Sequence, residues 1–443
     1  GNGSIFFKTG GNANSNASSG GADAMSITNS QNVVVCNDLT VSGNLTINGT
    51  TTTLNTATLD IEDKTLCIAK GAADATAANG AGILVDGANA TLLYNSSGDY
   101  WAFNKSIHAS NFKQGGTNFT DSILLGTSTT GTLSSATCNV GVGVLALQSI
   151  TSGCENVVMG HKTGHCVTTG KQNTFIGHHS GCLTSTGFSN TAIGTRAMAS
   201  NTTGNRNVAI GYRALAANVC CGDNIVIGHQ ALEQAPQSKT HIAIGSNVMR
   251  SADAGSEYNV GIGGNALYGN TTGGYNIAIG YQSMFNSTTA SNNVALGFQT
   301  LYHGTTYRDN FALGSCTMCC VTGSFNVAIG NSIMRTASTA EKNIGIGYNV
   351  LNAATTAARD TAIGYQSMMS TTDGSDNVAI GSCSLRANTT GISNTAIGSA
   401  ALRDNTTGTR NVAIGFCALR DTTIGQCNVA VGMAAMMLNT TGS

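Results

Sequence analysis

Charged residues, proline and tryptophan are scarce in this sequence. Asp, Glu, Lys and Arg make up 9% of the 443 residues, and there is one proline and one tryptophan. The net charge is −1 and there is no basic run, which argues against nucleic acid as a partner. No apolar run approaches the ~20 residues of a membrane-spanning helix, so membrane insertion is not expected.

The ends of the chain carry no targeting information. It begins at Gly1 without an initiator methionine or a signal peptide, and it stops at Ser443 within a repeat. We interpret it as a processed or partial piece of a longer protein, so the missing signal says nothing about export.

What fills the sequence instead is a repeat whose clearest copy is Asn-Val-Ala-Ile-Gly at residues 207–211. The interval between closing glycines is 17 in fifteen of the seventeen steps, with one step of 18 and one of 16. A fixed period over this length predicts a stacked repeat architecture. The closing glycines are Gly143, Gly160, Gly177, Gly194, Gly211, Gly228, Gly245, Gly263, Gly280, Gly297, Gly314, Gly330, Gly347, Gly364, Gly381, Gly398, Gly415 and Gly432.

Each position in the repeat is numbered from this glycine, position 0. Position −1 is always aliphatic and −3 is Val, Ile, Thr or Phe. Because side chains alternate between the two faces of a strand, −1 and −3 lie on the same face. We assign this face to the core, together with the Leu or Met at +4. Position −2, Ala or Gly in fifteen of eighteen copies, is expected to face a partner chain. Position −4 is Asn in sixteen copies, and His241 and Asp360 are the two exceptions. We expect these amides to form hydrogen bonds with one another and with the turn backbone at a corner of the coil.

The repeat favours strands over helices. It has a glycine in every copy, β-branched residues at −1 and −3, and a Thr/Gly turn such as Asn201–Gly204. This pattern predicts that each coil consists of a strand, a bend, a second short strand and a turn. The predicted fold is all-β: a parallel β-solenoid of about 18 coils, roughly 85 Å long at the usual strand spacing. One coil alone is marginally stable, so neighbouring coils and chains must add stability.

The region before the repeats has a different pattern. We divide the chain into a Gly/Asn/Ser-rich segment at 1–31, a short-strand β shaft at 32–103, a Thr/Gly-rich connector at 104–137 and the solenoid at 138–443. Within the shaft, Trp101 beside Phe103 is expected to anchor a small core rather than bind sugar. Strands are predicted at 33–35, 39–41, 45–47, 54, 59–61, 66–68, 82–85, 91–94 and 100–103.

The 14 cysteines do not form a disulfide framework on the 17-residue frame, because no two of them are separated by one full period. Scattered thiols suit folding in a reducing cytoplasm. Cys316, Cys319 and Cys320 include a CxxC spacing, but no second ligand pair supports metal or redox chemistry. We therefore assign no metal-binding or cofactor-binding residue and expect no cofactor.

Catalytic residues are not recognised either. A glycan hydrolase needs paired carboxylates, and the seven acids named below are scattered through the turns, with no two at the same position of adjacent coils, so we expect no enzyme. Two periodic surface features remain. We assign the threonines at +8 to a corner of the coil rather than to an ice-binding face. We assign the aromatic and histidine rings at +1 to stacks that stabilise consecutive coils rather than to a sugar-binding platform. The acids are Glu233, Asp253, Glu257, Asp309, Glu341, Asp373 and Asp376; the rings are His161, His178, Tyr212, His229, Tyr281, Phe298, Tyr348, Tyr365 and Phe416.

Repeats such as Asn207–Leu215 and Asn276–Met284 resemble the head repeats of trimeric autotransporter adhesins, and still more the repeats of bacteriophage and giant-virus tail fibres. Residues 38–66 and 94–103 are similar to phage fibre shafts. The resemblance implies a homotrimer with a left-handed β-roll, working as a virion tail or capsid fibre that binds other fibre proteins and a host glycan or protein receptor. A bacterial trimeric surface adhesin, extracellular on the cell surface, is the alternative, and an ice-binding solenoid is a further one. Known adhesin heads commonly have shorter repeats than this chain.

Overall fold

The computed structural model describes residues 5–8, 23–27, 32–35, 39–42, 44–47, 68–69, 72–85, 90–97, 100–104, 112–114, 118–126, 130–252 and 255–442. All regular elements in these residues are strands, in agreement with the predicted all-β class. The described residues therefore contain no helix suited to crossing a membrane. The chain divides into two compact units, Gly1–Ala72 and Ala73–Ser443.

The first unit contains an antiparallel sheet of β1 (Ile5–Lys8), β2 (Asp23–Ile27) and β3 (Val33–Val35). The Gly/Asn/Ser-rich segment thus supplies two of the three strands, neither of which the sequence predicted. Residues 39–41 and 45–47, predicted as strands, have no regular structure. The strands predicted at 54, 59–61 and most of 66–68 lie outside the described residues.

A second antiparallel sheet contains β4 (Gly82–Val85), β5 (Ala90–Asn95) and β6 (Tyr100–Phe103), as predicted. Trp101 is not the buried anchor that we expected. Its side chain is 51% exposed and contacts Tyr94 across the strand pair, with ring centroids 5.8 Å apart. Three strands on their own cannot enclose a residue of this size, so the ring is covered on one side only.

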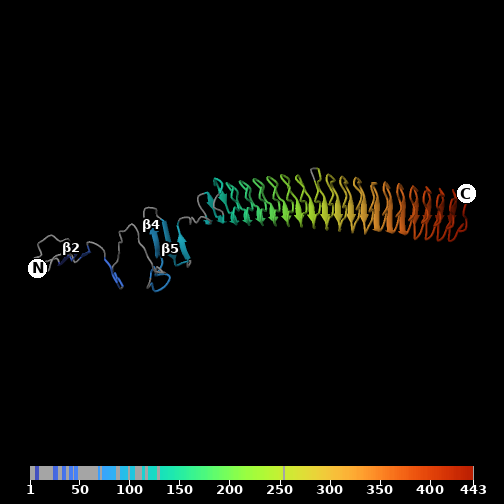
Figure 1. Cartoon of the computed structure of the whole chain (residues 1–443). Coiled ribbons are helices and arrows are strands. Elements are labelled where there is room, and N and C mark those ends of the chain that lie inside the picture. Colours follow the sequence, from blue (N-terminus) through green and yellow to red (C-terminus); the bar gives the residue numbers. More distant parts are fainter. Residues whose placement is uncertain are drawn as a thin grey trace. The chain divides into compact units, whose positions relative to one another are not determined.

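The repeats form the predicted parallel β-solenoid, visible in Figure 1 as a row of stacked coils. One strand of each coil pairs in register with the same strand of the next, from β9 to β11 and on through β28, and β7 pairs antiparallel with β9. The strands before the repeats are β7 (Phe112–Gln114), β8 (Phe119–Thr120), β9 (Ile123–Leu125) and β10 (Ala136–Thr137). Strand β10 pairs with β8 in a separate two-stranded sheet. The repeat strands are β11 (Val140–Val142), β12 (Val157–Met159), β13 (Thr174–Ile176), β14 (Thr191–Ile193), β15 (Val208–Ile210), β16 (Ile225–Ile227), β17 (Ile242–Ile244), β18 (Val260–Ile262), β19 (Ile277–Ile279), β20 (Val294–Leu296), β21 (Phe311–Leu313), β22 (Val327–Asn331), β23 (Ile344–Tyr348), β24 (Thr361–Tyr365), β25 (Val378–Ile380), β26 (Thr395–Ile397), β27 (Val412–Ile414) and β28 (Val429–Val431).

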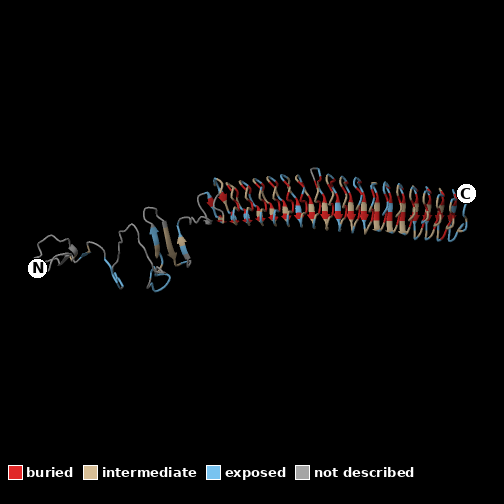
Figure 2. Cartoon of the chain, viewed as in Figure 1, coloured by how far each residue is buried: buried red, intermediate tan, exposed pale blue. Residues whose placement is uncertain are grey.

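The two faces of the strand are the reverse of what the sequence predicted. In β15, Ala209 at −2 is fully buried inside the coil, whereas Val208 and Ile210 at −3 and −1 are on the outside and partly exposed. The same pattern holds along the sheet, where the residue at −2 is buried in every repeat strand (Figure 2). The assignment of −1 and −3 to the core and of −2 to a partner chain was therefore wrong.

The reason is the narrow cross-section of the coil. In most coils position +4 supplies a large side chain, such as Leu215, that is fully buried as predicted. Opposite it, at −2, fifteen of the eighteen coils carry only alanine or glycine, and the exceptions are Val158, Phe175 and Val226. The one coil with Phe175 at −2 confirms this, because a Cβ added at Gly181, the neighbouring +4 position, would lie 2.6 Å from the Phe175 ring.

The bend after the strand requires glycine. Gly211 has φ = +130°, and a Cβ there would lie 2.4 Å from the carbonyl oxygen of Gly228 in the next coil. Beyond the bend, the predicted second strand is absent. Arg213 at +2 and Leu215 at +4 both have left-handed backbone conformations, with φ of 55° and 52°, and the chain turns there instead.

The asparagines at −4 form the predicted corner, and it is a continuous ladder. Asn207 donates from its backbone N–H and from Nδ2 to Oδ1 of Asn190, at 3.0 and 3.2 Å, and from Nδ2 to the carbonyl of Cys221 at 3.0 Å. Asn224 repeats the pattern one coil later on Oδ1 of Asn207. Each buried amide is thereby satisfied by its neighbours above and below.

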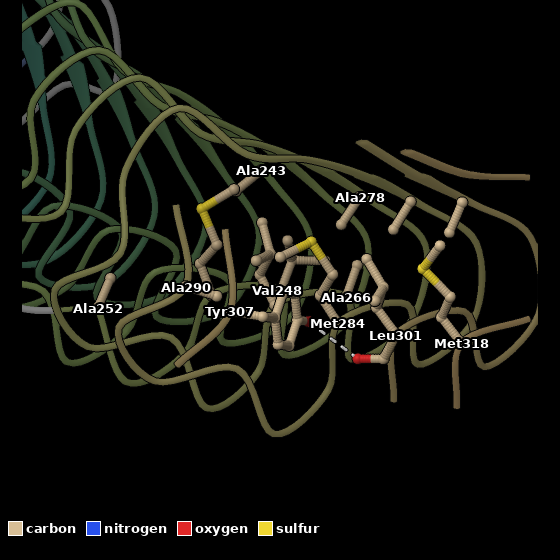
Figure 3. Close-up of a cluster of buried hydrophobic side chains, with 14 of the residues drawn as sticks. Ala243, Val248, Ala252, Ala266, Ala278, Met284, Ala290, Leu301, Tyr307 and Met318 are labelled. Atoms are coloured by element: carbon tan, nitrogen blue, oxygen red, sulfur yellow. Dashed lines mark hydrogen bonds between the residues drawn. The ribbon is translucent and has the colours of Figure 1, made fainter. Parts of the chain in front are cut away.

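Two coils depart from 17 residues: one has 18, between Gly245 and Gly263, and one is shorter, with 16 residues between Gly314 and Gly330. In the coil before it, Tyr307 is fully buried at a place where most other coils carry glycine or alanine. Its hydroxyl shares a hydrogen bond with Ser287 at 2.5 Å and donates to the Leu301 carbonyl at 3.0 Å, and the ring packs among the core side chains in Figure 3. Burial raises the pKa of this hydroxyl well above its usual range.

Candidate functional surfaces

The outer face of the long sheet is an aliphatic surface. It consists mainly of the aliphatic side chains at −3 and −1 in 18 successive coils, and 13 of the residues at −1 are isoleucine. Ile225 and Ile227, for example, are 41% and 37% exposed. Contiguous apolar surfaces of more than a few hundred Å² are rare on monomeric soluble proteins and mark interaction sites.

Rings at +1 stack between successive coils, as predicted. Tyr348 and Tyr365 lie 5.5 Å apart between centroids and within 8° of parallel, and Tyr212 and His229 are 5.3 Å apart. A second stack at +5 was missed: Tyr268, Phe285 and Tyr302, with centroids 5.1 and 5.2 Å apart. The signal was in the sequence, because these rings also recur with the 17-residue period.

A groove of about 790 Å³ crosses several coils on the side that carries positions +2 and +5. Alanines and Ser200 form part of its lining, and three arginines border it: Arg196, Arg213 and Arg250. Glu233 is almost fully buried between two of them, with its carboxylate oxygens 2.8 Å from Arg213 and 2.9 Å from Arg250. The hydrogen bond from Arg250 to Glu233 raises the pKa of the arginine.

The acids considered for catalysis are engaged separately. Glu257 lies 3.7 Å from Lys239, Glu341 3.2 Å from Lys342, and Asp376 2.6 Å from Arg359 in the preceding coil. Asp373 accepts hydrogen bonds from the hydroxyls of Thr356 and Thr355, which lower its pKa. Glu233 lines the groove, Asp309 follows Arg308 at a bend, and Asp253 lies outside the described residues.

The threonines at +8 use their hydroxyls within the chain. Oγ1 of Thr202 donates to the carbonyl of Val219 at 2.9 Å, and Oγ1 of Thr271 donates to that of Thr288 at 3.0 Å. The same bond recurs at Thr389 and Thr406. This supports the corner interpretation over an ice-binding face, because the donors are already committed to the neighbouring coil.

The twelve cysteines in the described part of the chain are all free thiols, as the 17-residue frame predicted. Two of them belong to a group that sequence reasoning did not find. One ring nitrogen of His303 and the sulfurs of Cys319 and Cys320 all lie within 4.8 Å of one another. The signal was the spacing, because the histidine precedes the two thiols by one coil.

A second group contains three histidines, His161, His178 and His179, whose ring nitrogens are equally close. His161 and His178 stack at 5.3 Å. The pKa of His179 is lowered, first by burial and then by the neighbouring histidines and by Lys162 and Arg196. This group is therefore surrounded by positive charge.

Searches of family models, of curated proteins and of solved structures returned no match to this chain.

Proposed function

We propose that this chain is the rod of a virion fibre, in the tail or on the capsid, that self-associates into a trimer and holds a host-attachment surface away from the particle. The observation that carries the proposal is the aliphatic outer face of the sheet. It runs the length of the solenoid, and an unpaired face of this kind is costly in water.

Copies of the same chain match this face better than an unrelated partner does. A second copy presents the same side chains at the same spacing between coils, so contacts made at one coil recur at all the others. An unrelated partner would lose this register within a few coils. The number three is the one implied by the resemblance to tail fibres and adhesin heads.

Sedimentation equilibrium and native mass spectrometry test the assembly. We expect a mass of three chains that persists at high dilution. Ile210→Glu together with Ile279→Glu places charge on the outer face and should yield monomers that keep their β-sheet circular dichroism signal. The matched control is Thr203→Glu with Thr272→Glu, at exposed positions of the turn, and it should remain trimeric. A monodisperse wild-type monomer would contradict the proposal.

Immunogold electron microscopy tests the location. Antibodies against the purified chain should label thin appendages on virus particles. Labelling of a bacterial envelope without virions would support the alternative, a trimeric surface adhesin. The proposal includes no catalytic step, so turnover of a surface glycan by the purified chain would also count against it.

A further inference from the structure

The fold brings one imidazole and two thiols together at the short coil. His303 and Cys320 both occupy position +6 of their coils and Cys319 occupies +5, so the three side chains emerge side by side from two neighbouring coils. The backbone N–H of His303 donates to the carbonyl of Cys319 at 2.7 Å, which fixes the two coils against each other at this point. The three ligand atoms are mutually within 4.8 Å.

The imidazole is oriented by its neighbours. Tyr302 packs edge-on against the His303 ring, with centroids 4.4 Å apart, and Nδ2 of Asn286 lies 3.4 Å from Nδ1. Since the two ends of an amide can be interchanged, Asn286 Oδ1 can accept a hydrogen bond from Nδ1–H. In that orientation Nδ1–H is the donor and Nε2 is unprotonated, which is the arrangement that outer partners impose on metal-binding histidines.

Two thiols this close to each other are poor acids. The pKa of Cys319 is raised to about 12, first by burial and then by Cys320 and Cys316, while Arg335 acts in the opposite direction. A divalent cation between the sulfurs would offset the repulsion between two thiolates. Thiolate and imidazole are the ligands that zinc prefers in proteins, at about 2.3 and 2.0–2.1 Å.

We propose that His303, Cys319 and Cys320 bind one zinc ion, with water as the fourth ligand. Side-chain rotation at this surface position draws the three ligand atoms to the separations of a tetrahedral site. Binding releases a proton from each thiol, so affinity falls as the pH is lowered. The ion joins the coil that contains Tyr307 to the 16-residue coil, the one place where the stack loses a residue. The proposal does not depend on the function proposed above.

The chain supplies its own controls. Cys220 and Cys221 are also adjacent in sequence, with sulfurs 3.3 Å apart, and burial together with the neighbouring thiol raises the pKa of Cys221 to about 11. Within the described residues, no histidine completes a ligand group with this pair. The three-histidine group at His178 has imidazoles but no thiolate, and Lys162 and Arg196 oppose a cation there.

The test uses the full chain, reduced with a phosphine, equilibrated with zinc and dialysed. Metal analysis should give about one zinc per chain. Replacing zinc with Co²⁺ should produce the sulfur-to-cobalt charge-transfer band and the visible bands of a tetrahedral site. His303→Ala, and Cys319→Ser with Cys320→Ser, should lose both the bound metal and the bands. Circular dichroism of the metal-free variants checks that the solenoid still folds.

The control variants are Cys220→Ser with Cys221→Ser, and His178→Ala, and both should keep the zinc and the cobalt spectrum of the parent chain. The proposal is overturned by wild-type chain that retains no zinc after dialysis. It is equally overturned if the zinc persists in the His303 and Cys319/Cys320 variants, or if it disappears in either control.

Discussion

The carboxyl group of Asp360 accepts hydrogen bonds from both the backbone N–H and the side-chain amide of Asn377, at 2.8 and 3.1 Å. It thereby substitutes for an asparagine in the corner ladder. Its second oxygen, which replaces the donating amide, is buried without a partner. Burial is the main cause that raises the pKa of Asp360 to about 7, and the hydrogen bonds from Asn377 only partly oppose it.

Asp360→Asn should therefore stabilise the solenoid at alkaline pH. The folded-state pKa lies above the unfolded value, so stability is fully present below about pH 4 and is lost as the pH rises to about 7. At pH 8 the variant should gain on the order of 4 kcal/mol, with little change at pH 4. Denaturant unfolding at both pH values measures this. Asp376→Asn, which removes an exposed and solvent-screened pair with Arg359, should leave the unfolding midpoint nearly unchanged at both pH values.

His241→Asn should have the opposite pH dependence. His241 accepts from the N–H of Asn259 through Nδ1 at 3.2 Å, and burial lowers its pKa to about 4. Because the folded pKa is below the unfolded one, stability is present above about pH 6.5 and is lost as the pH falls to about 4. We expect the variant to remain stable through this window, as followed by thermal melting at pH 4.5 and pH 7.5. If the variant loses stability between pH 7.5 and pH 4.5 as much as the wild-type chain does, His241 is not the cause of the acid sensitivity. The exposed substitution His229→Asn is the control.

Gly211→Ala tests the close approach of neighbouring coils. The added Cβ meets the Gly228 carbonyl at 2.4 Å and also disfavours φ = +130°, so the melting temperature should fall by several degrees. Gly432→Ala separates the two causes. Gly432 has a similar φ of +123°, but nothing lies within 4 Å of the added Cβ. The melting temperature of the Gly432→Ala variant should therefore fall less than that of Gly211→Ala. Equal losses at both sites would show that the backbone conformation alone matters.

Ala209→Asp tests which strand face is enclosed. An aspartate side chain inside the coil would be buried without a partner, so we expect a loss of roughly 3 kcal/mol or more of folding stability. If Ala209 faced a partner chain instead, the variant would dissociate into folded monomers. Denaturant unfolding and sedimentation, measured together, distinguish the two results. Thr203→Asp, at an exposed turn position, should change neither.

The sequence by itself determined the coil. Several features are visible in the sequence as residue types that recur every 17 residues. They are the period itself, the asparagine at −4, the glycine at 0, the leucine or methionine at +4 and the rings that stack at +1. They could be predicted because a residue in one coil contacts the residue at the same position of the next coil. Residues in contact are therefore one period apart in the sequence. The pair His303 and Cys320, both at +6, obeys the same rule, although it is not a repeated motif and was missed for that reason.

Only the tertiary structure decided which side of the strand is inside. Alternation shows that Val208 and Ile210 share one face and that Ala209 has the other, but it does not say which is enclosed. Hydrophobicity favoured the larger pair, and that choice was wrong. The coil is too narrow to hold them opposite Leu215, so the methyl group of Ala209 is enclosed and the larger side chains are left outside. The same geometry creates the aliphatic face on which the proposed assembly rests.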